Sequence, residues 1–174
     1  MAAGLLVAEF VSPTADAREG VLLAAWIWPI LVWSQMGCRE SRHAMHSLIF
    51  SAEHVVYRQL AALWTAGVLV ALLTGAGTGI RLLISTNWQM FAAWFVGALF
   101  IPSLALAFGV WSGSSRLFEA IYTVWWYVGP LHHTPSLDFV GTSGASSSPG
   151  LYLGLAGVLV LASGVGRRRQ VAYA

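Results

Sequence analysis

The sequence predicts an all-α fold, that of a polytopic helical membrane protein with about five transmembrane or partly re-entrant helices. Composition is the first reason: hydrophobic residues make up 57% of the 174 residues and charged residues only 9%, whereas an average soluble domain has about 25% charged residues. Length is the second reason, because several apolar runs approach the roughly 20 residues that a helix needs to cross a membrane. We therefore expect residues 1–174 to form a single transmembrane domain.

Five apolar segments are the expected membrane helices, at about 20–36, 60–80, 90–111, 117–128 and 151–165. Pro29 lies in the middle of the first segment, where we expect a kink because proline removes one helical hydrogen bond. The fourth and fifth segments are short for complete spans, so a partial or broken helix is an alternative for either. Two pairs of glycines, Gly75 with Gly79 and Gly109 with Gly113, have the GxxxG spacing that lets helices pack closely.

Arginines orient the predicted helices. The chain has no lysine, so all nine basic residues are arginines, and positively charged short loops stay on the cytoplasmic side of a membrane. If the C-terminal arginines are cytoplasmic, five crossings leave Arg18 and Arg81 outside and place the others inside, namely Arg39, Arg42, Arg58, Arg116, Arg167, Arg168 and Arg169. This arrangement predicts a cytoplasmic C-terminus, a cytoplasmic segment at 37–59 and an outer loop at 130–150.

The missing lysine also excludes several chemistries. A phosphate-binding P-loop needs a lysine that reaches the terminal phosphates, and Schiff-base catalysis needs a lysine amine. The single cysteine, Cys38, permits neither an internal disulfide nor a CxxC pair. The stretch GVWSG at 109–113 differs from the G-x-S-x-G nucleophile elbow. We therefore predict no catalytic residue and no cofactor, and we do not expect this chain itself to be an enzyme.

The polar segment at 37–59 separates the first two apolar segments. Its mixture of charged and apolar residues is typical of an interfacial helix or of a surface that docks on another protein. A charged loop needed only for topology is the alternative. Four of its side chains are of metal-ligand type: His43, His46, Glu53 and His54. Their H-x-x-H spacing differs from the H-E-x-x-H motif of metalloproteases, so we predict no metal site.

Several long stretches resemble a known family. They are WSQMGCRE at 33–40, LIFSAEHVVYRQLAALWTAGVLVALLTGAGTGIRLL at 48–83, FIPSLALAFGVWSGSSRLFEAIYTVWWYVGPL at 100–131 and LDFVGTS at 137–143. Over roughly 33–141 the chain resembles bacterial permeases of the type-two ATP-binding-cassette (ABC) transporter family. The family usually has six spans in each half, so the resemblance implies a chain that lacks the first span. It also implies a multi-pass protein of the bacterial inner membrane.

The resemblance implies a function and partners as well. The chain would be the permease subunit of an ABC exporter, driven by cytoplasmic ABC ATPase subunits, paired with a second permease half and surrounded by membrane lipids, with no nucleic acid bound. In such permeases the segment between the second and third spans presses against the ATPase. The corresponding candidate contacts here are Arg39, Glu40, Arg42, Glu53 and Arg58.

Arg116 and Glu119 are a candidate gating pair. They are three residues apart and share a helix face at the expected cytoplasmic mouth of the fourth segment. The alternative is an ion pair that only marks where the helix enters the membrane, since charges near a helix end reach water at little cost. Two other functions also stay open: a membrane-embedded hydrolase or metal enzyme that uses the histidines and Glu53, and a non-transporting scaffold.

Overall fold

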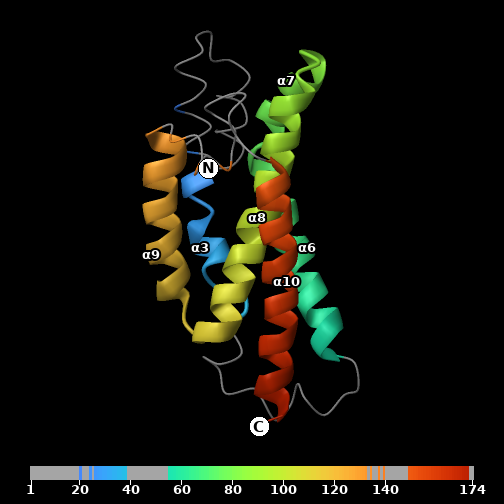
Figure 1. The fold of residues 1–174 in the computed structure, drawn as a ribbon, viewed down its shortest axis with the longest axis vertical. Helices are drawn as coiled ribbons and strands as arrows, with labels where there is room; N and C mark the ends of the chain where they lie inside the picture. Colours follow the sequence, from blue (N-terminus) through green and yellow to red (C-terminus); the bar gives the residue numbers. More distant parts are fainter. Residues whose placement is uncertain are drawn as a thin grey trace.

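The described part of the computed structural model is all-helical, which confirms the all-α part of the predicted fold class. The structure describes residues 20, 24, 26–38, 55–132, 134, 137, 139 and 149–172, and these residues form no strand. Figure 1 shows the helices running roughly side by side along one long axis. They are α3 (Ile30–Trp33), α6 (Val55–Thr74), α7 (Ala76–Ile84), α8 (Trp88–Ser112), α9 (Ser115–Trp126), the π-helix η1 (Tyr127–Leu131) and α10 (Pro149–Ala172).

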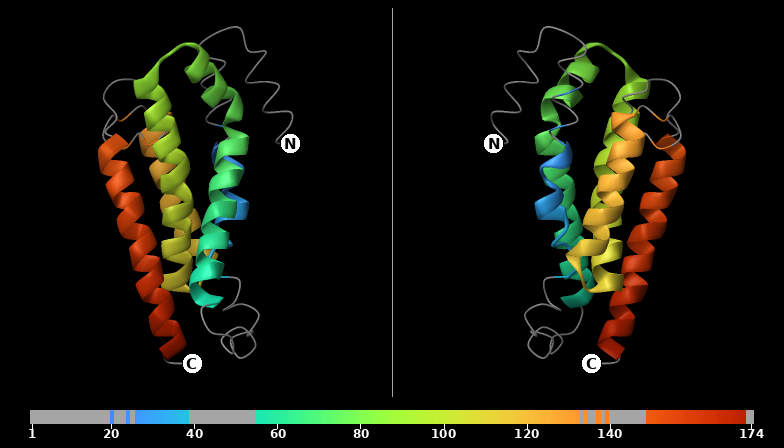
Figure 2. Two further views of the ribbon diagram at one scale, coloured as in Figure 1. Left: turned by 90° about the vertical axis from the view of Figure 1, so that its right-hand side faces the viewer. Right: turned by 90° about the vertical axis from the view of Figure 1, so that its left-hand side faces the viewer.

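Helix α8 lies at the centre of this bundle. It has no charged residue and it contacts α3, α6, α7, α9 and α10. In its most apolar stretch 72% of the residues are buried, against 22% in the most apolar stretch of α10. The two views in Figure 2 show α6 and α10 on opposite sides of α8. The outer surface of α10 carries exposed Leu153, Val158 and Leu161, which is the surface expected of a helix in contact with lipid.

Fewer helices pass the length test for a membrane span than the five predicted. Two described helices, Trp88–Ser112 and Pro149–Gln170, are long and apolar enough, and the pair α6 and α7 makes a third if it counts as one broken span. Helix α9 has 12 residues and is therefore about 18 Å long, which is too short to cross alone. The predicted span 20–36 is only partly described, and α3 begins directly after Pro29.

Helices α6 and α7 meet at a sharp bend, where the sequence predicts one helix over 60–80. The two axes differ by 65°, and Gly75 between them has φ −100° and ψ 12°. Glycine has low helix propensity and leaves room for close neighbours. A Cβ at Gly75 would lie 2.7 Å from Nε1 of Trp94. The bend therefore arises where an indole ring of α8 packs against the helix backbone.

The two GxxxG pairs have different roles in the structure. A Cβ at Gly109 would overlap the carbonyl oxygen of Met36, so Gly109 does permit the predicted close approach. Gly113 instead ends α8 in the left-handed conformation, with φ 63°. Ser114 then caps α9 by accepting a hydrogen bond from the backbone N–H of Arg116 at 3.3 Å.

Two segments differ from their predicted form: the last helix is longer, and part of the predicted outer loop is buried. Helix α10 runs well beyond the predicted limits of 151–165, because arginine is a good helix former and continues the helix past the apolar run. Within the predicted outer loop, Phe139 is buried in an aromatic cluster with Trp26, Phe100 and Tyr122. The described residues around 137–139 therefore pack back against α8 and α9.

Candidate functional site

One end of the bundle collects positive charge. Helix α6 begins at the lower end in Figure 1, α9 begins there and α10 ends there. Arg58 lies in the first turns of α6 and Arg116 is the second residue of α9, while Arg167, Arg168 and Arg169 lie in the last turns of α10. Arg81, on α7, is at the opposite end. Five of the six described arginines therefore share one end, as the topology prediction requires.

The candidate coupling contacts fall mostly outside the described residues. Arg39, Glu40, Arg42 and Glu53 belong to that part of the chain, and only Arg58 is described, with an exposed side chain. The backbone before the segment is fixed, because Gly37 packs against the backbone of Leu106 and Val110 near the lower end of α8. The chain after the segment resumes at the start of α6. Both flanks of 39–54 therefore lie at the arginine-rich end.

The candidate gating pair lies one turn from this end. Arg116 is exposed and Glu119 is half-buried, and no ion pair within 4.0 Å joins the two side chains. The backbone carbonyl of Glu119 accepts a hydrogen bond from Thr123 Oγ1 at 2.7 Å. The two residues are thus brought to one helix surface without pairing, and a gating role for them stays a prediction.

The end of α10 is fastened to the end of α8. Arg167 is buried and donates from Nη1 to Oε1 of Gln170 at 3.0 Å. Gln170 in turn donates from Nε2 to the carbonyl oxygen of Val110 at 2.6 Å. Arg169 lies over the ring of Trp111, 5.7 Å from its centroid, a distance at which a cation is attracted by an aromatic face. These contacts hold the three C-terminal arginines at a fixed place on the bundle.

Two tryptophans converge on the bend between α6 and α7. Trp26 is 0% exposed and Trp94 is 5% exposed, and a Cβ at Gly75 would lie within 3.4 Å of Nε1 of both rings. Neither indole N–H has a hydrogen-bond partner in the part of the chain that the structure describes. A buried donor left without an acceptor costs about 1 to 3 kcal/mol. Sequence reasoning missed this pair, and the closely spaced glycines at 75, 77 and 79 are the only signal that could have indicated it.

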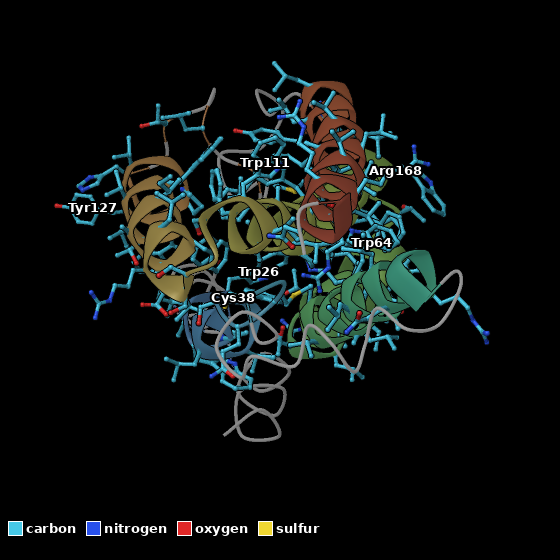
Figure 3. The ribbon with its side chains drawn as sticks, turned by 90° about the horizontal axis from the view of Figure 1, so that it is seen from below. Trp26, Cys38, Trp64, Trp111, Tyr127 and Arg168 are labelled. Atoms are coloured by element: carbon cyan, nitrogen blue, oxygen red, sulfur yellow. The ribbon has the colours of Figure 1, made fainter. Side chains whose placement is uncertain are left out.

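The aromatic core connects the segment of α3 to α9. Tyr122 is buried and donates its hydroxyl hydrogen to the carbonyl oxygen of Trp26 at 2.6 Å. Its ring packs edge-on against Trp33 and is stacked on Phe118. Figure 3 shows Trp26 between the helices, with Tyr127 and Arg168 toward the outside of the bundle. Helix α9 is therefore packed into the core through one face, although it carries a charged first turn.

The four side chains of metal-ligand type named from the sequence lie outside the described residues. They are His43, His46, Glu53 and His54. Among the residues that the structure does describe, no group of three or more His, Cys, Asp or Glu side chains is placed to hold a metal ion. His132 is exposed and its ring meets the ring of Tyr127 edge-on, with centroids 4.5 Å apart. The arrangement of the described residues is thus a charged end, an apolar helical body and a bent helix.

Comparisons with known proteins add no family to this description. No family model, no curated protein and no solved structure matches the chain.

Proposed function

We propose that this chain is the permease subunit of an ABC exporter of the bacterial inner membrane, powered by a separate cytoplasmic ATPase. The observation that carries the proposal is the collection of arginines at one end of the bundle, where both flanks of the segment 39–54 also lie. A permease that is driven by a separate cytoplasmic ATPase must contact that ATPase through a surface that reaches the cytoplasm. The arginine-rich end fits that role by the positive-inside rule.

The alternation of the helices supports the same proposal. The chain passes down through α3, up through α6 and α7, down through α8, up through α9 and η1, and down through α10. In a multi-pass permease these five passes would be the membrane segments, with α9 and η1 together forming the fourth. The bend at Gly75 adds a broken helix, a feature that transporters commonly place near the path of their substrate.

An apolar body favours a hydrophobic or amphipathic substrate. The described helices contain one carboxylate, Glu119, and their arginines lie near the helix ends, including Arg81 in the last turn of α7. A polar substrate would need more buried polar partners along its path, because unpaired polar groups are costly away from water. The proposed export direction rests on the family resemblance.

Copurification with an ABC ATPase tests the function. The tagged chain is extracted in mild detergent from its own membranes, and bound ABC ATPases are identified and quantified by mass spectrometry. We expect one ABC ATPase at a fixed ratio to the chain. We also expect the triple variant Arg39→Glu, Arg42→Glu, Arg58→Glu to lose it, because reversed charges disrupt a polar docking surface.

The matched control is Arg81→Glu, which reverses a charge at the opposite end of the bundle. This variant should retain the ATPase, and size-exclusion chromatography should show that both variants remain folded. Absence of any ABC ATPase from the wild-type preparation would contradict the proposal. Equal loss of the ATPase from the triple variant and from Arg81→Glu would contradict the assignment of the docking surface to the arginine-rich end.

A further inference from the structure

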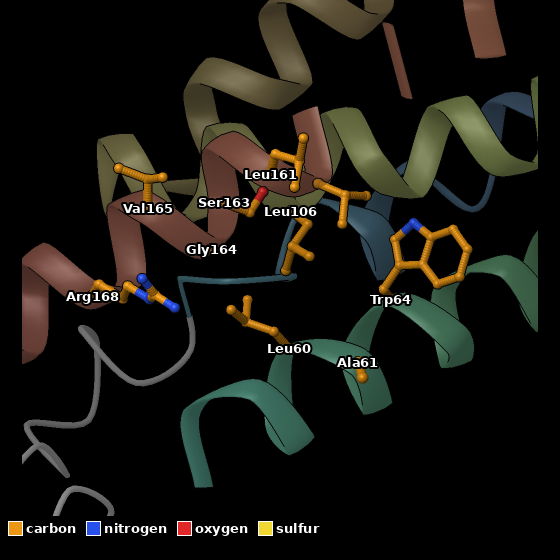
Figure 4. Close-up of a pocket in the computed structure, with 10 residues that line it drawn as sticks. Leu60, Ala61, Trp64, Leu106, Leu161, Ser163, Gly164, Val165 and Arg168 are labelled. Atoms are coloured by element: carbon orange, nitrogen blue, oxygen red, sulfur yellow. The ribbon is translucent and has the colours of Figure 1, made fainter. Parts of the chain in front are cut away.

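A groove runs between α6 and α10, with α8 as its floor. It has a volume of about 450 Å³ and its walls include Leu60 and Trp64 of α6, Leu106 of α8, and Gly164 and Arg168 of α10. Figure 4 shows these side chains around the groove, with Arg168 at one end and Trp64 toward the other. The volume falls in the range of about 300 to 1,000 Å³ that is usual for ligand sites.

The groove exists because α6 and α10 pack on α8 far more than on each other. Small residues keep it open: a Cβ added at Gly164 would meet nothing within 4 Å, and Ala61 lies on the facing wall. A lipid-facing groove of this kind has no water to fill it, since the hydrocarbon core excludes water. Its natural occupant is therefore an apolar chain.

The walls present an apolar surface although they contain polar atoms. Ser163 donates its hydroxyl hydrogen to the carbonyl oxygen of Leu159 at 2.7 Å, and Trp64 donates from Nε1 to Oγ of Ser103 at 2.9 Å. Both polar groups are thus already hydrogen-bonded within the protein. An occupant of the groove gains from apolar contact along its length rather than from hydrogen bonds.

The charge at one end of the groove is positive. Arg168 lines that end, Arg169 follows it on α10, and Arg58 lies near the start of α6. None of the three helices that form the groove contains Asp or Glu. Basic sites between membrane helices attract anionic lipid headgroups, and arginine is well suited to bind phosphate.

We propose that this groove binds one acyl chain of an anionic phospholipid, with the lipid's phosphate held at the end that carries Arg168. The site needs no transport activity, so the inference goes beyond the proposed function and does not depend on it. A neutral phospholipid would fill the apolar part but would gain less from the arginine. A second copy of this chain, inserted in the same orientation, would bring its own arginine-rich end to the same side, where like charges repel.

Native mass spectrometry with defined lipids tests the site. The purified chain in detergent is incubated with phosphatidylglycerol or with phosphatidylcholine, and the bound lipid is counted across collision energies. We expect preferential retention of phosphatidylglycerol. Arg168→Gln should reduce that preference about fivefold, the effect of one arginine near an anionic headgroup, and Arg116→Gln, at the same end but on α9, should leave it unchanged.

A second pair of variants tests the groove itself. Gly164→Leu places a side chain in the groove, and Gly157→Leu makes the same change two turns earlier on α10, where a Cβ also meets nothing within 4 Å and the position does not line the groove. We expect Gly164→Leu to lose bound phosphatidylglycerol and Gly157→Leu to retain it. Thermal unfolding of both variants checks that the bundle is intact. If either glycine variant fails to fold, the Arg168→Gln measurement still tests the proposal.

Three outcomes would overturn the proposal. The first is equal retention of the two lipids by the wild-type chain, and the second is equal lipid binding by Gly164→Leu and Gly157→Leu. The third is a wild-type dimer that Gly164→Leu converts to monomers, because a second copy of the chain would then occupy the groove.

Discussion

At the scale of single residues, Glu119 is the described charge with the strongest case for a role in transport. Its spacing from Arg116 predicts a shared helix face, and the structure places Glu119 half-buried at the second turn of α9. The sequence could not predict that the two side chains do not pair, because pairing depends on rotamers and on neighbouring helices. A half-buried carboxylate without an ion-pair partner can change partners when helices move.

Replacing Glu119 with glutamine tests this role. The substitution keeps the size of the side chain and removes its charge. We expect export of an amphipathic dye, measured in cells that carry the chain and its ATPase, to fall severalfold while the amount of assembled protein stays the same. The physical reason is that a neutral amide cannot attract the successive cationic partners that a gate requires.

The control for Glu119→Gln is Thr123→Val, one turn further along the same helix, where the side chain is exposed. It removes the hydroxyl that bonds the backbone carbonyl of Glu119 but leaves the carboxylate. Dye export should be close to the wild-type rate in this variant. If Glu119→Gln lowers protein abundance and export in equal proportion, its role is structural.

At the scale of elements, the contact between the end of the α3 segment and α8 depends on one glycine. Gly109→Ala would place a methyl group on the carbonyl oxygen of Met36, a backbone atom that cannot move without displacing the whole segment. Overpacking of this kind costs about 1 to 3 kcal/mol. We expect a lower thermal unfolding temperature in detergent, measured by tryptophan fluorescence.

The same substitution elsewhere provides the comparison. Gly157→Ala on α10 meets no neighbour within 4 Å, so it should leave stability unchanged or raise it by up to about 1 kcal/mol through helix propensity. If the two variants unfold at the same temperature, the segment after α3 does not pack on α8 as described.

The elements that could be predicted are those with long apolar runs. The run at 90–111 predicts α8 to within a few residues, since a stretch that is apolar on all sides is typical of a buried or membrane helix. The bend at Gly75 and the burial of Phe139 could not be predicted, because both depend on rings from distant parts of the chain, Trp94 and Trp26. The groove beside Arg168 could not be predicted either, because its walls come from three helices that are brought together only in the fold.

At the scale of the whole molecule, the proposed function depends on which side of the membrane the two ends face. Arg81 and the turn at Ser85 lie at one end, and the other described arginines lie at the opposite end. The sequence could predict this division because alternating passes return successive loops to alternate sides. It could not predict that the flank before 39–54 is anchored at the arginine-rich end by contacts of Gly37 with α8.

Cysteine labelling in a Cys38→Ala background decides the orientation. Cys38 is buried, and its small side chain makes alanine a mild replacement. Ser85→Cys places one thiol in an exposed turn, and Ser41→Cys places one in the arginine-rich segment. With a membrane-impermeant maleimide we expect Ser85→Cys to react in spheroplasts, and Ser41→Cys to react only after lysis, because a cytoplasmic thiol is shielded by the intact membrane. The reverse pattern would put the segment 39–54 outside, beyond the reach of any cytoplasmic ATPase, and would refute the permease proposal. The proposed lipid groove would remain, with its Arg168 end in the outer leaflet instead of the inner one.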